Sequence, residues 1–156
     1  MINPNLAAAA ILIASCAFAG WSDLFRRRIP NWLCAITALA GLAMTIASGS
    51  FAMVGNHALH AAIALAVGMA LFALRVVGGG DAKFYAAIAS WFPLRSAGAL
   101  IMFVGGCGFV LLVVWFVARR LRGKPIRTSG NDPFDGLPYG IAIASGAVIM
   151  NFVANS

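Results

Sequence analysis

Gly78-Gly79-Gly80-Asp81-Ala82-Lys83 is a glycine run that ends in an acid, and it lies between two strongly apolar segments. Glycine gives the backbone conformational freedom that other residues lack, so the run predicts a break between two helices. The acid needs an explanation, because a carboxylate is costly to place beside apolar segments away from water. Asp81 is therefore the first candidate functional residue, and the nature of the flanking segments decides the fold.

The composition of the whole chain is typical of an integral membrane protein. Of its 156 residues 62% are hydrophobic and only 10% are charged, and the mean hydropathy is +0.94. A soluble domain has about a quarter of its residues charged. A helix needs about 20 apolar residues to cross the hydrocarbon layer, so the chain holds at most about six short spans. We expect residues 1–156 to form a single all-α domain, a bundle of about six transmembrane helices.

The spans are predicted from the apolar segments and the residues that interrupt them. Pro30 limits continuation of the first helix, and Asn31 is expected to cap the second. In the fifth segment, Gly105, Gly106 and Gly108 would let a neighbouring helix approach closely. The first segment has no basic residue before it, unlike a signal peptide, so we expect it to be retained. The six segments are approximately residues 7–25, 32–47, 57–74, 82–92, 97–118 and 137–153.

The basic residues predict the orientation of this bundle. With six spans only Arg95 falls on one side, and the other side holds Arg26, Arg27, Arg28, Arg75, Lys83, Arg119, Arg120, Arg122, Lys124 and Arg127. Lys and Arg collect in cytoplasmic loops, so this side is expected to be cytoplasmic and both termini non-cytoplasmic. Topology and anionic lipid headgroups account for the net charge of +7, so no nucleic-acid partner is expected.

The same side holds all four acids of the chain, namely Asp23, Asp81, Asp132 and Asp135. Asp23 and Asp81 are expected at the ends of the first and fourth helices, near the edge of the hydrocarbon layer, where ionisable groups are usually functional. Two carboxyls held together share a proton, so that one activates a water and the other acts as an acid. This is the chemistry of an aspartic protease, with water as the nucleophile. The helix dipole would favour an ionised Asp81 and a protonated Asp23.

Simpler interpretations of both acids stay open. Asp81 would serve equally well as the N-cap of the fourth helix. Asp23 would serve as an interfacial acid neutralised by Arg26 or Arg27. Asp132 and Asp135 fit either a solvated loop or a site that attracts a basic peptide.

The cysteines and histidines do not predict a metal site. Cys16, Cys34 and Cys107 lie far apart in apolar segments and are interpreted as small apolar residues. His57 and His60 lie on one face at the outer end of the third span, without a third ligand, and are interpreted as interfacial residues.

Three motifs together resemble the type IV prepilin peptidase family, membrane aspartic proteases with a Gly-x-Gly-Asp motif. The motifs are Asp23-Leu24 followed by Ile29-Pro30-Asn31, then Gly78-x-Gly80-Asp81-x-Lys83-Phe84, and last Pro138-Tyr139-Gly140. The resemblance implies that Asp23 and Asp81 are the catalytic pair, without a metal or organic cofactor. It also implies supporting roles, in the active site or in substrate binding, for Gly78, Gly80, Lys83, Pro138, Tyr139 and Gly140. The simpler alternatives are that Lys83 is a lysine at the membrane interface and that Tyr139 anchors its helix there.

The chain is similar to the compact, peptidase-only members associated with Flp pilins of tight-adherence systems. Longer members carry an added domain with paired Cys-x-x-Cys motifs and a methyltransferase activity, which this sequence does not support. The resemblance implies a multi-pass protein of the bacterial cytoplasmic membrane that cuts the short basic leader from a prepilin at the cytoplasmic face. Its expected partners are the prepilin, membrane lipid and the pilus-assembly machinery. A small transporter or channel subunit, or a non-catalytic assembly scaffold, are the alternative functions.

Overall fold

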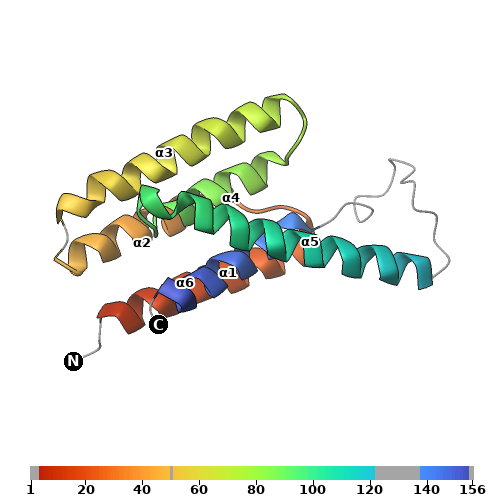
Figure 1. Cartoon of the computed structure of the whole chain (residues 1–156), viewed down its shortest axis with the longest axis horizontal. Helices are drawn as coiled ribbons and strands as arrows, with labels where there is room; N and C mark the ends of the chain where they lie inside the picture. The colour runs from red at the N-terminus through yellow and green to blue at the C-terminus, as the bar shows by residue number, and fades with distance from the viewer. Residues whose placement is uncertain (1–3, 50, 122–137, 155–156) are drawn as a thin grey trace.

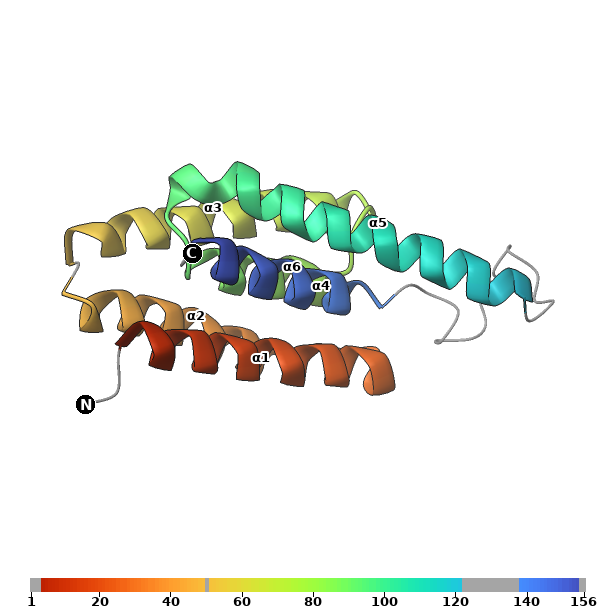
Figure 2. The ribbon, with the colours of Figure 1, turned by 60° about the horizontal axis from the view of Figure 1, so that its bottom comes forward.

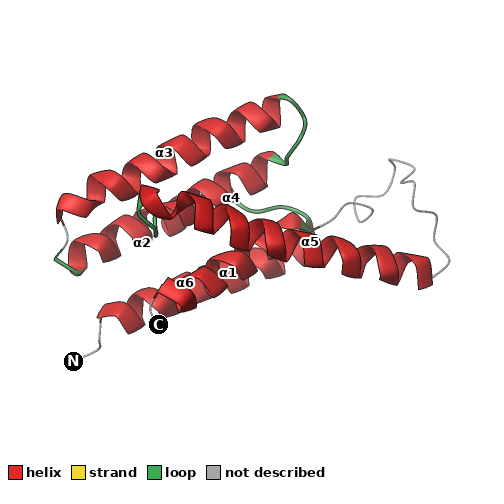
Figure 3. Cartoon of the chain, viewed as in Figure 1, coloured by secondary structure: helices red, strands yellow, loops and turns green. Residues whose placement is uncertain are grey.

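The computed structural model describes residues 4–49, 51–121 and 138–154, and the regular structure in these ranges is entirely helical (Figure 1, Figure 3). The prediction of an all-α fold is therefore confirmed for the described part of the chain. In order, the helices are α1 (Pro4–Arg26), α2 (Asn31–Ala47), α3 (Phe51–Ala73), α4 (Gly79–Ala89), the short 3₁₀ helix η1 (Leu94–Ser96), α5 (Ala97–Leu121) and α6 (Tyr139–Ala154).

Three segments are long and apolar enough to cross a membrane, namely Leu6–Arg26, Phe51–Ala73 and Leu94–Leu121. The helices Asn31–Ala47 and Tyr139–Ala154 are apolar but shorter. Helix α4 has only 11 residues, about 16 Å of helix, which is roughly half of the hydrocarbon thickness. The six predicted segments are thus helices, while the number that spans the bilayer stays a prediction.

Two helices begin earlier than the sequence pattern predicts. Helix α3 starts at Phe51 rather than near His57, so the connection from α2 is much shorter than expected. Helix α4 starts at Gly79, and the Ala82 amide donates to the Gly78 carbonyl at 3.0 Å. The glycine run is therefore only partly a break, because Gly79 and Gly80 already form the first helical turn. The real break follows Arg75, whose positive φ of 59° ends α3.

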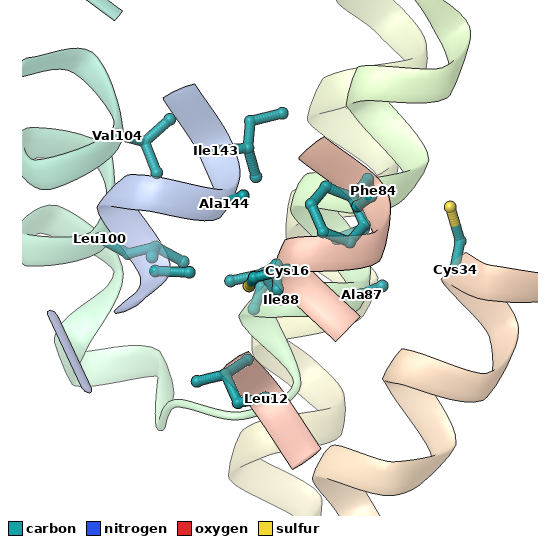
Figure 4. Close-up of a cluster of buried hydrophobic side chains, with 14 of the residues drawn as sticks. Leu12, Cys16, Cys34, Phe84, Ala87, Ile88, Leu100, Val104, Ile143 and Ala144 are labelled. Atoms are coloured by element: carbon teal, nitrogen blue, oxygen red, sulfur yellow. The ribbon is translucent and has the colours of Figure 1, made fainter. Parts of the chain in front are cut away.

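Helix α4 lies at the centre of the bundle, packed against α2, α3 and α6. Its Phe84 and Ile88 side chains are fully buried. Figure 4 shows side chains of α1, α5 and α6 converging on them, among them Cys16 and Leu100. Cys16 and Cys34 belong to this apolar core, which confirms their interpretation as small apolar residues. Because α4 is enclosed on several sides, the position of its first turn is firmly set.

Small residues bring particular helices into close contact. A Cβ atom at Gly146 of α6 would lie 2.6 Å from the Cα of Val104 in α5, and one at Gly68 of α3 would lie 3.0 Å from the Ala82 Cβ in α4. In α5 the predicted close approach holds for Gly108, which faces the Tyr139 ring, but not for Gly105 and Gly106, which have no atom within 4 Å of a built Cβ.

His57 and His60 are buried rather than interfacial, which corrects the prediction. Their exposed fractions are 9% and 2%. Nδ1 of His57 lies 3.0 Å from the Ser90 carbonyl oxygen, and Nδ1 of His60 lies 2.9 Å from that of Phe92. These carbonyls follow the last turn of α4, where helical carbonyls lack intrahelical partners. The histidines therefore fix the end of α4 that is farthest from Asp81.

The helix ends divide into two groups at opposite ends of the molecule. Figures 1 and 2 show the ends of α1, α3 and α5 at the same end of the molecule as the beginnings of α2, α4 and α6. The beginning of α1 and the end of α6 lie at the other end. This arrangement places Asp23, Asp81 and Gly140 at one end, although which membrane side that end faces remains a prediction.

Candidate active site

Asp23 lies in the last complete turn of α1 and is 7% exposed. Helix α1 ends because Arg27 adopts a positive φ of 51°, and the Arg27 amide donates to the Asp23 carbonyl at 3.0 Å. The buried Ser22 hydroxyl donates to the Arg28 carbonyl at 2.7 Å and holds the following turn. Local sequence thus determines both where α1 stops and how Asp23 is presented.

The Asp23 carboxylate is held by a residue 117 positions away. The Gly140 amide, in the first turn of α6, donates a hydrogen bond to Oδ2 of Asp23 at 2.8 Å. A Cβ atom at Gly140 would lie 2.8 Å from the same oxygen and 2.9 Å from Cδ1 of Ile29. Only glycine fits this close approach without displacing a neighbour. Gly140 therefore contacts Asp23 directly, and the supporting role that the resemblance implies for it stays a prediction.

Asp81 lies in the first turn of α4, three residues after the N-cap. The N-cap residue is Gly78, and no side chain caps the helix through a hydrogen bond. The simpler interpretation of Asp81 as the N-cap is therefore wrong. A Cβ atom at Gly78 would lie 2.8 Å from Oδ2 of Asp81, so glycine at this position leaves room for the carboxyl.

Asp23 and Asp81 line the same pocket, which has a volume of about 600 Å³. The other walls come from the α1–α2 turn and the glycine run, and they comprise Ser22, Arg26, Arg27, Arg28, Ile29, Pro30, Asn31, Gly78, Gly79 and Gly80. The predicted juxtaposition of the two acids at one end of the bundle is thus what the fold produces. The Arg27 side chain lies close enough to Asp23 for their charges to interact.

Burial of Asp81, together with the nearby Asp23 carboxylate, raises the pKa of Asp81 from 3.8 to about 6. Asp81 precedes the apolar part of α4 and lies outside the long membrane-spanning helices. The expectation that the α4 N-terminus keeps Asp81 ionised is therefore wrong in direction. Desolvation and a neighbouring like charge both disfavour the charged carboxyl, and they act against the helix dipole.

Lys83 connects α4 to the turn that precedes α2. Its Nζ donates a hydrogen bond to Oδ1 of Asn31 at 3.1 Å. Asn31 is the first residue of α2 and not its cap; the N-cap position is occupied by Pro30, without a side-chain hydrogen bond. A hydrogen bond between two motif residues 52 positions apart therefore stabilises the wall of the acidic pocket at Asn31. Neither interpretation of Lys83 predicted this bond.

Pro138 precedes α6, and Tyr139 is its first residue. Tyr139 lies on the side of Asp81 that faces away from the acidic pocket. Pro138 is buried, and its carbonyl accepts the Ile141 amide at 3.2 Å. The Tyr139 ring packs against Gly108 of α5 and, with Asp81, lines a second cavity. Tyr139 is thus a wall of the site and not only an interface anchor. Asp132 and Asp135, with Arg122, Lys124 and Arg127, lie outside the described residues.

Two residues near the acids were not singled out in the sequence. Ser22 is 2% exposed beside Asp23, and a polar residue at the end of an apolar segment was its only signal. Tyr85 lies one helical turn after Asp81, and its buried hydroxyl has no hydrogen-bond partner within the described part of the chain. The one-turn spacing was visible in the sequence, but burial of the hydroxyl was not.

The site offers two carboxyls that face a common pocket and differ in their surroundings. Asp23 accepts a backbone hydrogen bond from Gly140, whereas Asp81 lies in the first turn of α4 beside the glycine run. Such a pair can activate a water molecule and protonate a leaving group. Within the described residues, no cluster of three or more His, Cys, Asp or Glu side chains could hold a metal ion.

Comparison with known proteins agrees with this chemistry. The model of the type IV leader peptidase family matches residues 10–120, which include both acids and the glycine run. No curated protein and no solved structure matches the chain. The match covers more than half of the sequence, and a peptidase family suits a pair of carboxyls that line one pocket. The chain therefore belongs to the type IV leader peptidase family and is a membrane peptidase by family.

Proposed function

We propose that this protein is an aspartic endopeptidase that removes the short basic leader from a type IV prepilin of the Flp class. The observation that carries the proposal is the common pocket of Asp23 and Asp81. Asp23 lies near the end of the long apolar helix α1, so we infer that the pocket lies where a membrane-anchored substrate would emerge from the bilayer. The family match to leader peptidases supports the class of reaction.

The proposed reaction is hydrolysis of a peptide bond by a water held between the two carboxyls. The ionised carboxyl takes a proton from the water as its oxygen attacks the scissile carbonyl carbon, and the protonated carboxyl donates to the carbonyl oxygen. Collapse of the intermediate then transfers a proton to the departing amine and releases the leader. Since the pair titrates jointly, the roles belong to the pair. The raised pKa of Asp81 is consistent with a proton shared by the pair near neutral pH.

The proposed location is the bacterial cytoplasmic membrane, with the acids at the cytoplasmic face. Arg26, Arg27 and Arg28 line the same pocket as the acids, so the positive-inside rule assigns that end of the bundle to the cytoplasm. A substrate with a cytoplasmic leader and an apolar helix would then present the bond between them at this depth.

Co-expression of the protein with an Flp-class prepilin tests the proposal. The variants Asp23→Asn and Asp81→Asn keep side-chain size but cannot exchange a proton, so each should slow cleavage by a factor of at least about 100. Immunoblots would measure the precursor, the mature pilin and the peptidase in the membrane fraction. Normal processing by either variant would overturn the mechanism.

A further inference from the structure

A second cavity lies on the other side of Asp81, with a volume of about 370 Å³. Its walls come from α3, α4, α5, η1 and the start of α6. At one end it contains Asp81 and Tyr139, and at the other it reaches His60 and Leu94. The cavity therefore runs from the first turns of α4 towards η1. We call this cavity, lined by His60, Ile63, Ala64, Val67, Gly68, Leu71, Val77, Asp81, Ala82, Tyr85, Leu94, Ala97, Ile101, Val104, Gly105, Tyr139 and Ile143, the α3–α5 groove.

The groove exists because α3 and α5 do not pack on each other. Helix α3 packs on α4 and α5 packs on α6, while both contact η1. Figure 1 shows the two helices diverging from the η1 end towards the end that holds Asp81. Small residues on both sides, such as Ala64 and Gly105, keep the groove open, and a Cβ atom at Gly105 would meet nothing within 4 Å.

The lining of the groove is almost entirely apolar, and its polar groups belong to His60, Asp81, Tyr85 and Tyr139. Nδ1 of His60 is already paired with a backbone carbonyl, and Asp81 is assigned to catalysis. The buried hydroxyl of Tyr85 has no partner in the described ranges, although leaving such a group unpaired usually costs about 1–3 kcal/mol. Because this hydroxyl is buried, the groove offers an occupant mainly apolar surface.

Among the described residues, Asp81 is the one that lines both the groove and the acidic pocket. The acidic pocket is rich in charged side chains, whereas the groove is apolar. A chain that passes from one to the other therefore changes from a polar to an apolar environment at Asp81. A precursor whose polar leader is joined directly to an apolar helix has the same change at the bond to be cut.

We propose that the α3–α5 groove binds the apolar helix on the C-terminal side of the scissile bond, with that bond beside Asp81. The proposal rests on the proposed function and names the binding site for its substrate. A helix satisfies its own backbone hydrogen bonds in the bilayer, so an apolar wall of small residues is sufficient to hold it. The leader then lies in the acidic pocket.

Gly105 and its neighbour Gly106 provide a matched pair of variants. Both have open space around a built Cβ, so a large side chain is accommodated in the fold at either position. Only Gly105 lines the groove. Gly105→Trp should therefore fill the groove without unfolding the protein, and Gly106→Trp should place the same side chain outside it.

Cleavage is measured on the full precursor and on a short peptide that spans the cut site but lacks the apolar helix. Gly105→Trp should cut the precursor about ten-fold more slowly, mainly through a higher KM. The peptide should be affected less, so the cleavage rate of the precursor divided by that of the peptide should fall. Gly106→Trp should match the wild type on both substrates. Equal losses in the two variants, or full activity of Gly105→Trp, would overturn the proposal.

Photo-crosslinking separates this inference from the proposed function. In the Asp81→Asn background, p-benzoylphenylalanine at position 105 should capture the apolar helix of the precursor, and the same group at position 106 should not. If position 105 captures the helix but the wild-type protein cuts no precursor, the proposed function is wrong. The assignment of the groove as the binding site for the helix would still hold. Capture of lipid alone at position 105 would overturn the groove as a substrate site, whatever the cleavage result.

Discussion

Asp81, one of the two proposed catalytic acids, lies in surroundings that oppose its negative charge. A proton-sharing pair needs one protonated carboxyl, and the protonated form of Asp81 is lost as the pH rises through about 6. We therefore expect the cleavage rate to fall by about ten-fold per pH unit well above that value. Initial rates of precursor cleavage in liposomes between pH 5 and pH 9 would show this. A rate that stays constant from pH 5 to pH 8 would contradict it.

The same raised pKa has a consequence for stability. Ionised Asp81 costs the folded state free energy above pH 6, and this cost vanishes below pH 3.8, where the carboxyl is protonated in both states. Relative to the wild type, Asp81→Asn should gain stability on the order of 2 kcal/mol between pH 4 and pH 6 and keep it at higher pH. Thermal unfolding in detergent would serve as the measurement and as a folding control for the inactive variant.

Gly140 is the residue whose replacement should be most damaging to the geometry of the acids. In Gly140→Ala the new methyl group would meet Oδ2 of Asp23 at 2.8 Å and displace it. A shift of this kind near 1 Å typically costs about 100-fold in rate. Gly80→Ala should cost far less, since its Cβ would lie 3.7 Å from Ile29, an ordinary contact. Gly98→Ala, with open space at its Cβ, is the control, and similar rates for all three variants in a cleavage assay would refute this ranking.

At the scale of elements, the site depends on how α4 is held at both ends. His57 and His60 bond the carbonyls that follow its last turn, and Lys83 bonds the beginning of α2 near its first turn. Helix α4 is too short to be stable alone, so these contacts and its buried faces determine its position. A small movement of α4 would change the separation of the two carboxyls directly.

The bond between Lys83 and Asn31 makes this dependence testable. Lys83→Met and Asn31→Ala should each lower activity several-fold, consistent with a hydrogen bond worth about 0.5–1.5 kcal/mol. Because both substitutions remove one interaction, the double variant should be no worse than either single variant. Asn31→Asp keeps an acceptor and should retain the activity. Additive losses of kcat in the double variant would show that the two residues act independently.

At the scale of the whole molecule, the antiparallel order of the helices decides which residues meet. The ends of α1, α3 and α5 lie with the beginnings of α2, α4 and α6, so the acids and Gly140 share one end (Figure 2). The charge distribution predicts that this end is cytoplasmic. The bundle then separates an inner end with the catalytic pair from an outer end held by the histidines.

Site-directed labelling would test this orientation. In a background without the native cysteines, a cysteine at exposed Val76, between α3 and α4, should react with a membrane-impermeant thiol reagent only after the cells are opened. A cysteine at exposed Ser48, which follows α2, should react in intact cells. The opposite pattern would invert the topology and place the acids on the outer face.

The sequence by itself determined that the chain forms apolar helices suited to a membrane and approximately where those helices lie. It also singled out Asp23 and Asp81 as the candidate pair of acids. These follow from local composition and from charges counted along the chain, which need no tertiary information. It misjudged the start of α4, the proton preference of Asp81 and the surroundings of the histidines. Those properties depend on burial and on residues far apart in the chain.

The tertiary structure alone decided that Gly140 donates to Asp23, that Lys83 braces Asn31, and that Asp81 joins an acidic pocket to an apolar groove. A periodic pattern predicts which residues form a helix, but it does not fix which helices pack together or which are kept apart. Close helix approach at Gly146 and the gap between α3 and α5 arise from the summed packing of the bundle. The geometry of the site is therefore a property of that packing.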